Sequence, residues 1–144
     1  MSTWTIVSHR AGARIVEHLR TGLRLVSQID HQAGKLKDGE IESDRPGRGA
    51  SSAGGGRHGL SQHESSHEHD AQTFARELAE VLRVARNEHR FERLVLVAEP
   101  HFLGILRGAL DSATSALVHD TVGKDLAHVP LRDLADHLRD VSFL

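Results

Sequence analysis

The sequence contains no cysteine, and this absence excludes disulfides, thiolate zinc sites and a cysteine nucleophile. Aromatic residues make up only 3% of the chain, so the core must consist mainly of leucine, valine, isoleucine and alanine, and platforms for stacking nucleic-acid bases are scarce. No apolar run approaches the roughly 18 residues of a membrane span, and the N-terminal residues show no export signal. We therefore expect a cytoplasmic protein without a membrane partner.

An excess of charge of one sign is also missing, because the net charge is -2 over 144 residues. No chain-wide attraction toward nucleic acid is expected, and any affinity for phosphate must come from a local cluster of positive charge. Hydrophobic residues make up 38% and charged residues 26%, as in globular proteins, and this length fits one core. We therefore predict a single domain over residues 1–144.

The first thirty residues show the alternation that is typical of strands. Residues 4–8 form an apolar, β-rich run, and apolar residues then recur at alternate positions within 13–19 and 23–29. Arg10-Ala11-Gly12 and Thr21-Gly22 supply turns between these segments. The pattern predicts an antiparallel meander of three strands with one face on the core.

Residues 31–65 lack periodicity and hold eight of the thirteen glycines, so we predict a long Gly/Arg/His loop there. Connections longer than about 12 to 15 residues are usually functional or disordered. Ser65-Ser66-His67-Glu68 matches a capping box, which predicts that the first helix begins at this point. Apolar residues then follow at helical spacing, and Asn87 is the predicted end of the helix.

The second half of the chain alternates buried strands with helices. Residues 94–98 are a continuous apolar run and residues 116–122 form another strand, while Pro100 and Pro130 suit the first turns of two helices. A helix between two buried strands makes a right-handed crossover, so these strands should run parallel. The predicted fold is α/β, with a mixed five-stranded sheet, made of the antiparallel meander plus two parallel strands, and with covering helices.

The loop contains a cationic segment, because residues 45–63 hold three arginines and six glycines but no carboxylate. Arginine can grip a phosphate through two hydrogen bonds, and glycine lets the backbone approach an oxyanion closely. One interpretation is phosphate or RNA binding by Arg45, Arg48, Gly54, Gly55, Gly56, Arg57 and His58. Composition alone favours the other interpretation, a solvated loop whose arginines pair with carboxylates at positions 38–44.

Two other groups of residues in the sequence carry alternative chemistries. Metal binding, and with it a hydrolase, would use His58, His63, His67 and Asp70, although the capping box places His67 in a first turn, where it diverges from His69. Residues 124–128 place charged side chains after the last strand, where either a site or a salt-bridged connector is expected. The interpretation we favour is non-catalytic and needs no cofactor.

Five segments together resemble one family: SDRPGR at 43–48, SAGGGRH at 52–58, FARELA at 74–79, RLVLVA at 93–98 and KDL at 124–126. On these segments the chain resembles the bacterial host-attachment proteins over nearly its whole length. That family in turn looks like the middle domain of archaeal and eukaryotic release factors and their Pelota relatives. The resemblance implies a five-stranded sheet of ribonuclease-H-like topology, with a long loop before a long helix.

The same resemblance implies an RNA partner, either the ribosome or transfer RNA. In release factors the comparable loop carries Gly-Gly-Gln and promotes peptidyl-tRNA hydrolysis, whereas here Gly54-Gly55-Gly56 is followed by Arg57, and Gln62 comes later. This departure argues against hydrolysis, but Pelota-like proteins bind without that motif. We therefore expect a translation-associated factor, with a hydrolase or a protein-interaction module in attachment or stress regulation as the alternatives.

Overall fold

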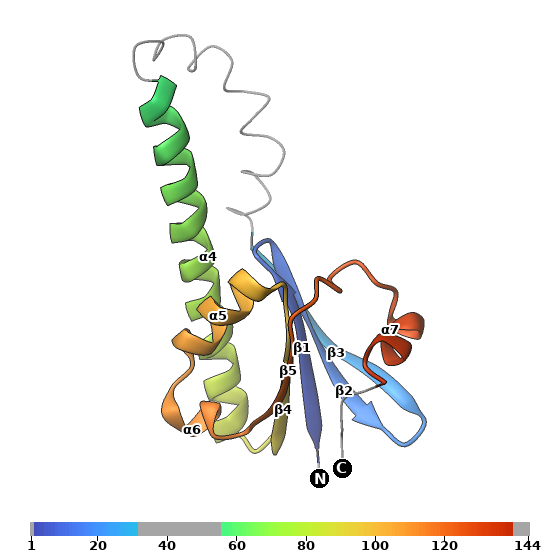
Figure 1. The fold of residues 1–144 in the computed structure, drawn as a ribbon. Coiled ribbons are helices and arrows are strands. Elements are labelled where there is room, and N and C mark those ends of the chain that lie inside the picture. Colours follow the sequence, from blue (N-terminus) through green and yellow to red (C-terminus); the bar gives the residue numbers. More distant parts are fainter. Residues whose placement is uncertain (1, 32–55, 140–144) are drawn as a thin grey trace.

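A computed structural model describes residues 2–31 and 56–139, and the side chains of residues 56–67 lie outside this description. The core of the molecule is one five-stranded sheet in the order β3-β2-β1-β4-β5 (Figure 1). The strands are β1 (Thr3–His9), β2 (Gly12–Leu19), β3 (Gly22–Asp30), β4 (Arg93–Val97) and β5 (Val118–Val122). The pairs β1/β2 and β2/β3 are antiparallel, while β1/β4 and β4/β5 are parallel. The predicted mixed sheet, with its meander and two parallel strands, is confirmed.

Both turns of the meander favour glycine over other residues. At the β2–β3 turn Gly22 has a φ of +134°, a conformation that side-chain-bearing residues rarely adopt. At the β1–β2 turn a Cβ on Gly12 would lie 3.0 Å from the carbonyl oxygen of Ile29, which is tighter than an ordinary contact. The predicted turn residues therefore match the geometry that the backbone needs.

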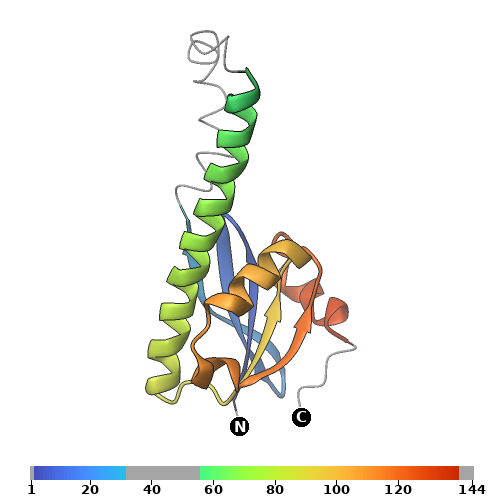
Figure 2. The same ribbon diagram turned by 60° about the vertical axis from the view of Figure 1, so that its left-hand side comes forward.

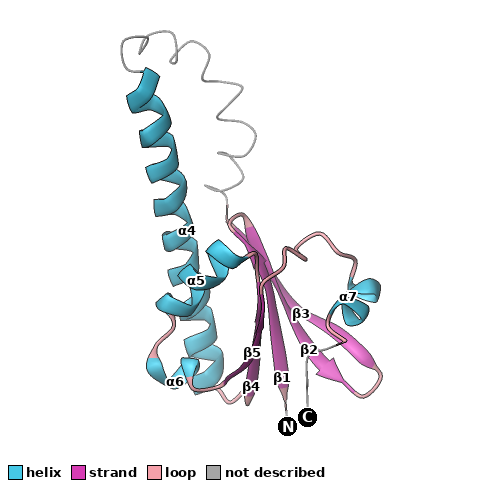
Figure 3. Cartoon of the chain, viewed as in Figure 1, coloured by secondary structure: helices cyan, strands magenta, loops and turns pink. Residues whose placement is uncertain are grey.

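Helices cover both faces of the sheet, as Figures 2 and 3 show from two directions. Helices α4 (Gly56–Asn87), α5 (Pro100–Ala109) and α6 (Ser112–Ser115) lie on one face, and α7 (Leu131–His137) lies on the other (Figure 1). The larger core packs α4 and α5 against the sheet and includes Phe74, Leu78 and Phe102. The smaller core packs Leu134 and Leu138 against Val16 and Val97. Burial on both faces explains why β4 is apolar from Leu94 to Val97.

Helix α4 begins at Gly56, so the predicted start at Ser65 is wrong, and so is the predicted loop over residues 56–65. The capping box is a local signal that also occurs inside helices, because serine and glutamate are tolerated there. No proline interrupts residues 56–65, and Gly59 costs only about 1 kcal/mol. Nothing in the sequence therefore stops the helix from extending past the capping box. The rest of the predicted loop, residues 32–55, lies outside the described residues.

The predicted end of α4 at Asn87 is confirmed, and the backbone shows how the helix stops. His89 adopts a left-handed φ of +58°. Its N–H donates to the Arg86 carbonyl at 2.9 Å, and the Arg90 N–H donates to the Ala85 carbonyl at 3.0 Å. This is a Schellman arrangement in which a histidine occupies the position that glycine usually takes.

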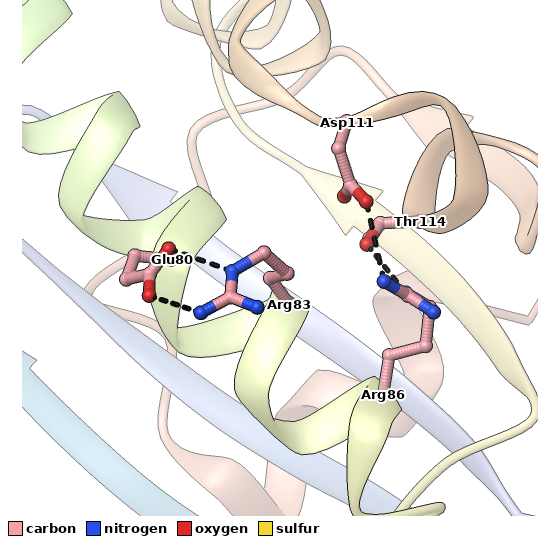
Figure 4. A network of polar contacts seen from close by, with 5 residues as sticks. All are labelled: Glu80, Arg83, Arg86, Asp111 and Thr114. Carbon is pink, nitrogen blue, oxygen red and sulfur yellow. Dashed lines mark hydrogen bonds and ion pairs between the residues drawn. The ribbon is translucent and has the colours of Figure 1, made fainter.

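A polar network fastens the C-terminal end of α4 to α6, a four-residue helix that the sequence pattern did not predict (Figure 4). Arg86 donates through Nε to Thr114 Oγ1 at 3.1 Å, and its Nη2 lies 3.3 Å from Asp111 Oδ2. Thr114 is fully buried, so this bond satisfies a hydroxyl inside the protein. On the outer face of α4, Arg83 makes two hydrogen bonds to Glu80.

The N-terminal third of α4 extends beyond the edge of the sheet (Figures 1 and 2). Its 32 residues correspond to roughly 48 Å at 1.5 Å per residue, more than the five-residue strands β4 and β5 can support. Ala71 is the first buried side chain along the described part of the helix. None of the described helices is both long and apolar enough to span a membrane.

Candidate functional site

The carboxyl ends of β1, β4 and β5 lie at one edge of the sheet, because these three strands are parallel. In α/β proteins this edge is where ligands usually bind. Two cavities lie there, of about 540 and about 470 Å³, and His9 at the end of β1 lines both. We therefore take this edge as the candidate site of the described body.

The larger cavity lies between the β1–β2 turn, the end of β3 and the connector from β5 to α7. Its polar lining consists of His9, Arg14, Gln28, Asp30 and His128. The rings of His9 and His128 lie 5.2 Å apart between centroids and are tilted by 54°. Ala11 N–H donates to His9 Nδ1 at 3.4 Å, which leaves Nε2 as the protonated nitrogen of a neutral ring.

Arg14 holds the connector against the sheet. It lies on β2, opposite Val7 of β1, and its Nη2 donates to the carbonyl of Leu126 at 3.0 Å. Its Nε is buried and has no hydrogen-bond partner among the described residues. Burial lowers the pKa of Arg14 below its usual value, because water solvates the guanidinium incompletely.

The smaller cavity lies where α4 meets α5. Glu99 is the N-cap of α5 and accepts from the N–H groups of His101 at 3.0 Å and Phe102 at 2.6 Å. His101 Nε2 lies 2.8 Å from Glu68 Oε2, and this hydrogen bond raises the pKa of His101, with the charge of Glu68 adding to the effect. Both side chains are exposed enough for water to screen the pair. Arg10 and Asp125 complete the polar lining.

These side chains suit ligand binding better than metal binding. Among the described residues, no three histidines and carboxylates approach one another closely enough to hold an ion. The larger cavity instead gathers two imidazoles and a guanidinium, all of which donate hydrogen bonds.

The cationic segment predicted from the sequence lies mostly outside this site. Arg45, Arg48, Gly54 and Gly55 are outside the described residues. Gly56, Arg57 and His58 form the first turn of α4, at the end that extends away from the sheet. Their predicted contact with phosphate stays a prediction.

The alternative metal ligands are all on α4. Because the helix starts early, His63, His67 and Asp70 follow one another at four and three residues and occupy one side of the helix by spacing. The expected divergence of His67 and His69 stands, since two residues turn a helix by about 200°. The side chains of His58, His63 and His67 are not described, so this set stays a prediction.

Residues 124–128 connect β5 to α7 and also line the two cavities. The Asp125 side chain accepts from the Ala127 N–H at 3.2 Å, which shapes the connector, while Asp125 and His128 line the two cavities. His9, Arg10, Arg14 and His101 were not singled out from the sequence. The signal that identifies three of them was present, because His9, Arg10 and His101 come at or just after the carboxyl ends of β1 and β4.

Comparison with known families decides the relationship. The family model described as "protein required for attachment to host cells" matches residues 4–138. The chain belongs to this family. None of the curated proteins compared with this host-attachment protein matches its sequence. The predicted host-attachment resemblance is thereby confirmed, whereas the likeness to release factors stays a prediction.

Proposed function

We propose that this host-attachment-family protein is a non-catalytic, translation-associated factor of the cytoplasm. It presents Arg45, Arg48, Arg57 and His58 to phosphates of ribosomal or transfer RNA, with the glycines at 54–56 letting the backbone approach. The observation that carries the proposal is the extension of α4 beyond the sheet, with Gly56 and Arg57 in its first turn (Figure 1).

The extension carries the first turn of α4 away from the sheet (Figure 1), and this supports contact with a large partner. A helix that served only to cover the sheet would begin near Ala71, the first buried residue among its described side chains. The described α4 members of the two cores all lie at or after Ala71. The N-terminus of a helix also carries a partial positive charge, which attracts phosphate and adds to that of Arg57.

Cosedimentation with ribosomes at two salt concentrations tests the proposal. Wild-type protein is expected to pellet with ribosomes at about 50 mM salt and to be released steeply as salt rises, because phosphate contacts displace condensed counterions. The combined variant R45A/R48A/R57A should lose this binding. The control R20A/R107A/R132A removes the same charge from exposed positions on the body and should bind as wild type does.

Two results would refute the RNA contact. One is an absence of cosedimentation at low salt. The other is an equal loss of binding in both triple variants, because it would mean that total charge, not the cationic segment, holds the RNA.

A metal-dependent hydrolase is a second candidate, and the early start of α4 favours it. Helical spacing of His63 and His67 is an arrangement that metal-binding helices use. Elemental analysis of purified protein should then find zinc or manganese at one equivalent, which the variant H63A/H67A loses and the variant H89A/H137A keeps. Protein purified without either metal would remove this candidate.

A further inference from the structure

A groove of about 310 Å³ lies between the C-terminal half of α4 and the sheet, and it shares no lining residue with the two cavities of the candidate site. Trp4 and Ile15, both almost fully buried, line it from the sheet, together with Val26 of the edge strand β3. On the helix side it is lined by Val81 and Val84, which are 39% and 41% exposed. These valines are two of the four large hydrophobic side chains that are exposed among the described residues. The groove is therefore an apolar surface that the described part of the chain leaves uncovered.

Carboxylates border the exposed valines along α4. Glu77, Val81, Val84 and Glu88 follow one another at intervals of four, three and four residues, so they share one flank of the helix. Glu88 comes just after the last helical residue, but its N–H still donates to the Val84 carbonyl at 3.0 Å. Glu80 also lines the groove, one turn before Val84. The valines thus lie between acidic side chains on both sides.

The arginines of α4 in its described part lie around the helix from this flank. Arg76 lines a separate cavity against α5, and Arg86 donates to Thr114 of α6. Arg83 reaches Glu80 with hydrogen bonds of 2.9 and 2.6 Å (Figure 4). An exposed pair of this kind contributes little to stability, so Glu80 can exchange this partner for another cation.

One arginine does line the groove, and it is engaged with the floor. The guanidinium of Arg90 lies 5.2 Å from the centre of the Trp4 ring, at cation–π distance. Glu77 Oε2 lies 3.6 Å from Nδ1 of the buried His31, which pairs with it only when the imidazole is protonated. The three carboxylates at 77, 80 and 88 outnumber the two guanidiniums at 83 and 90, so the border of the groove carries an excess of negative charge.

This charge pattern does not suit a second copy of the chain. If two such flanks packed antiparallel around their valines, Glu77 of one copy would face Glu88 of the other, because each lies four residues outside the valine pair. A parallel arrangement would bring identical carboxylates together. Like charges opposite one another disfavour association, so the occupant of the groove has to bring positive charge.

We propose that the groove binds a basic segment of a partner protein, in which apolar side chains are flanked by lysine or arginine. The apolar side chains cover Val26, Val81 and Val84, and the cationic ones pair with Glu77 and Glu88. These two carboxylates are eleven residues apart, or about 16 Å along the helix, which is the length of about five extended residues or three helical turns. The proposal is independent of the RNA contact, because no lining residue belongs to the segment at 45–58.

A peptide titration tests the groove, with the fluorescence of Trp4 as the signal, because this single tryptophan lines it. The first probe is an eleven-residue capped peptide with two lysines at each end and leucines and alanines between them. The second probe replaces its four lysines by glutamates. Wild-type protein should bind the lysine peptide at least about tenfold more tightly than the glutamate peptide at low salt, and the difference should shrink as salt screens the charges.

Two pairs of variants separate the apolar and the charged part of the contact. V81S/V84S should weaken binding of the lysine peptide about tenfold, because two valines lose apolar contact with it. Its control L19S/L25S changes the other two exposed large hydrophobic residues, which do not line the groove, and should change the affinity less than about twofold. E77Q/E88Q should weaken binding several-fold and reduce its salt dependence, whereas D133N/D136N removes the same charge from α7 and should bind as wild type does.

Three results would overturn the proposal: equal binding of the two peptides by wild type, binding by V81S/V84S as tight as that of wild type, or an equal loss in a variant and its control. A wild-type dimer in analytical ultracentrifugation that V81S/V84S dissociates would also overturn it, because a second copy would then cover the groove. The variant R45A/R48A/R57A should bind the lysine peptide as wild type does, and this separates failure of the groove from failure of the RNA contact.

Discussion

Helix α4 has two parts of different composition. From Ala71 to Ala85 seven apolar side chains are buried against the sheet and α5, whereas residues 56–66 include one leucine, two glycines and no other large apolar residue. The first part is held by the core, as most helices in proteins are. The second part extends past the sheet (Figure 2). Leu60 is the single large apolar side chain that its sequence offers for burial.

The difference teaches how an unsupported helical segment can exist. A free segment of this length is marginal in water, because starting a helix fixes several residues for the first hydrogen bond. Growth from an anchored helix avoids that starting cost, so the extension needs only weak propensity. Growth from the anchored part explains how the extension can form, and the proposed contact with a partner would give it a role.

The largest effect is expected from breaking the anchored part. Phe74 is fully buried and stacks on His31 at 4.9 Å and on Phe102 at 6.0 Å. F74A should lower the free energy of unfolding by about 3–5 kcal/mol, through lost burial and a cavity. Urea unfolding followed by the fluorescence of Trp4, the single tryptophan, measures it. The control V84A truncates a side chain of the same helix that is 41% exposed, and it should cost less than about 1 kcal/mol. Equal losses would mean that α4 is not anchored through its buried face.

Acid should weaken the body next most strongly, through a histidine on β2. Burial lowers the pKa of His18 from 6.5 to about 4, and its Nε2 lies 2.6 Å from the hydroxyl of the buried Thr5. The unfolded chain takes up a proton on His18 near pH 6.5, whereas the folded protein takes it up only near pH 4. The free energy of unfolding is therefore highest above pH 6.5 and falls as the pH drops from 6.5 to 4. The loss is on the order of 2–3 kcal/mol.

Comparison with H18Q isolates this loss from that of other groups, since glutamine cannot titrate but can still hydrogen bond to Thr5. The difference in unfolding free energy between wild type and H18Q should change between pH 6.5 and 4 and be constant above. A constant difference across the whole range would show that His18 titrates normally in the folded protein.

A smaller effect is expected at the start of α5, a helix that unlike α4 begins inside the body. Glu99 caps it by accepting two backbone N–H groups. E99A should destabilise the protein by about 1 kcal/mol, since both groups lose their partner. E99Q keeps a side-chain oxygen at the same place and should recover most of the loss in thermal unfolding. If E99Q were as unstable as E99A, charge and not capping would be the cause.

The sequence predicted those elements whose side chains alternate or repeat against a core. β1, β2 and β4 are examples, since Ile6, Ile15 and Leu96 are fully buried or nearly so at the expected positions. The start of α4 was not predictable in this way, because residues 56–66 contain one large apolar residue, Leu60, and therefore show no hydrophobic period. Helix α6 has four residues, too few to show a hydrophobic period. The hydrogen bond from Arg86 that holds it in place joins distant parts of the sequence and leaves no local pattern.

The cavity residues were missed for a related reason. Arg10 was interpreted as part of a turn, His9 was assigned to no element, and Arg14 fell between the alternating apolar positions of 13–19. Their convergence depends on how the β5–α7 connector crosses the end of the sheet, and a hydrogen bond between residues 112 positions apart fixes that crossing.

The smallest change in unfolding free energy is expected from a glycine-to-alanine substitution. The same substitution is made once in the extension of α4 and once in α5. Gly59 lies in the extension, while Gly104 lies in α5, where a Cβ would meet no atom within 4 Å. Alanine improves helix propensity by about 1 kcal/mol at either position. G104A should therefore raise the unfolding free energy of the body by about 0.5–1 kcal/mol, because α5 folds together with the core. G59A should leave it unchanged within about 0.3 kcal/mol and instead slow amide exchange about fivefold near residue 59, because the extension frays without unfolding the body. If G59A stabilised the body as much as G104A does, the extension would unfold together with the body. The proposal that it serves only to contact a partner would then have to be abandoned.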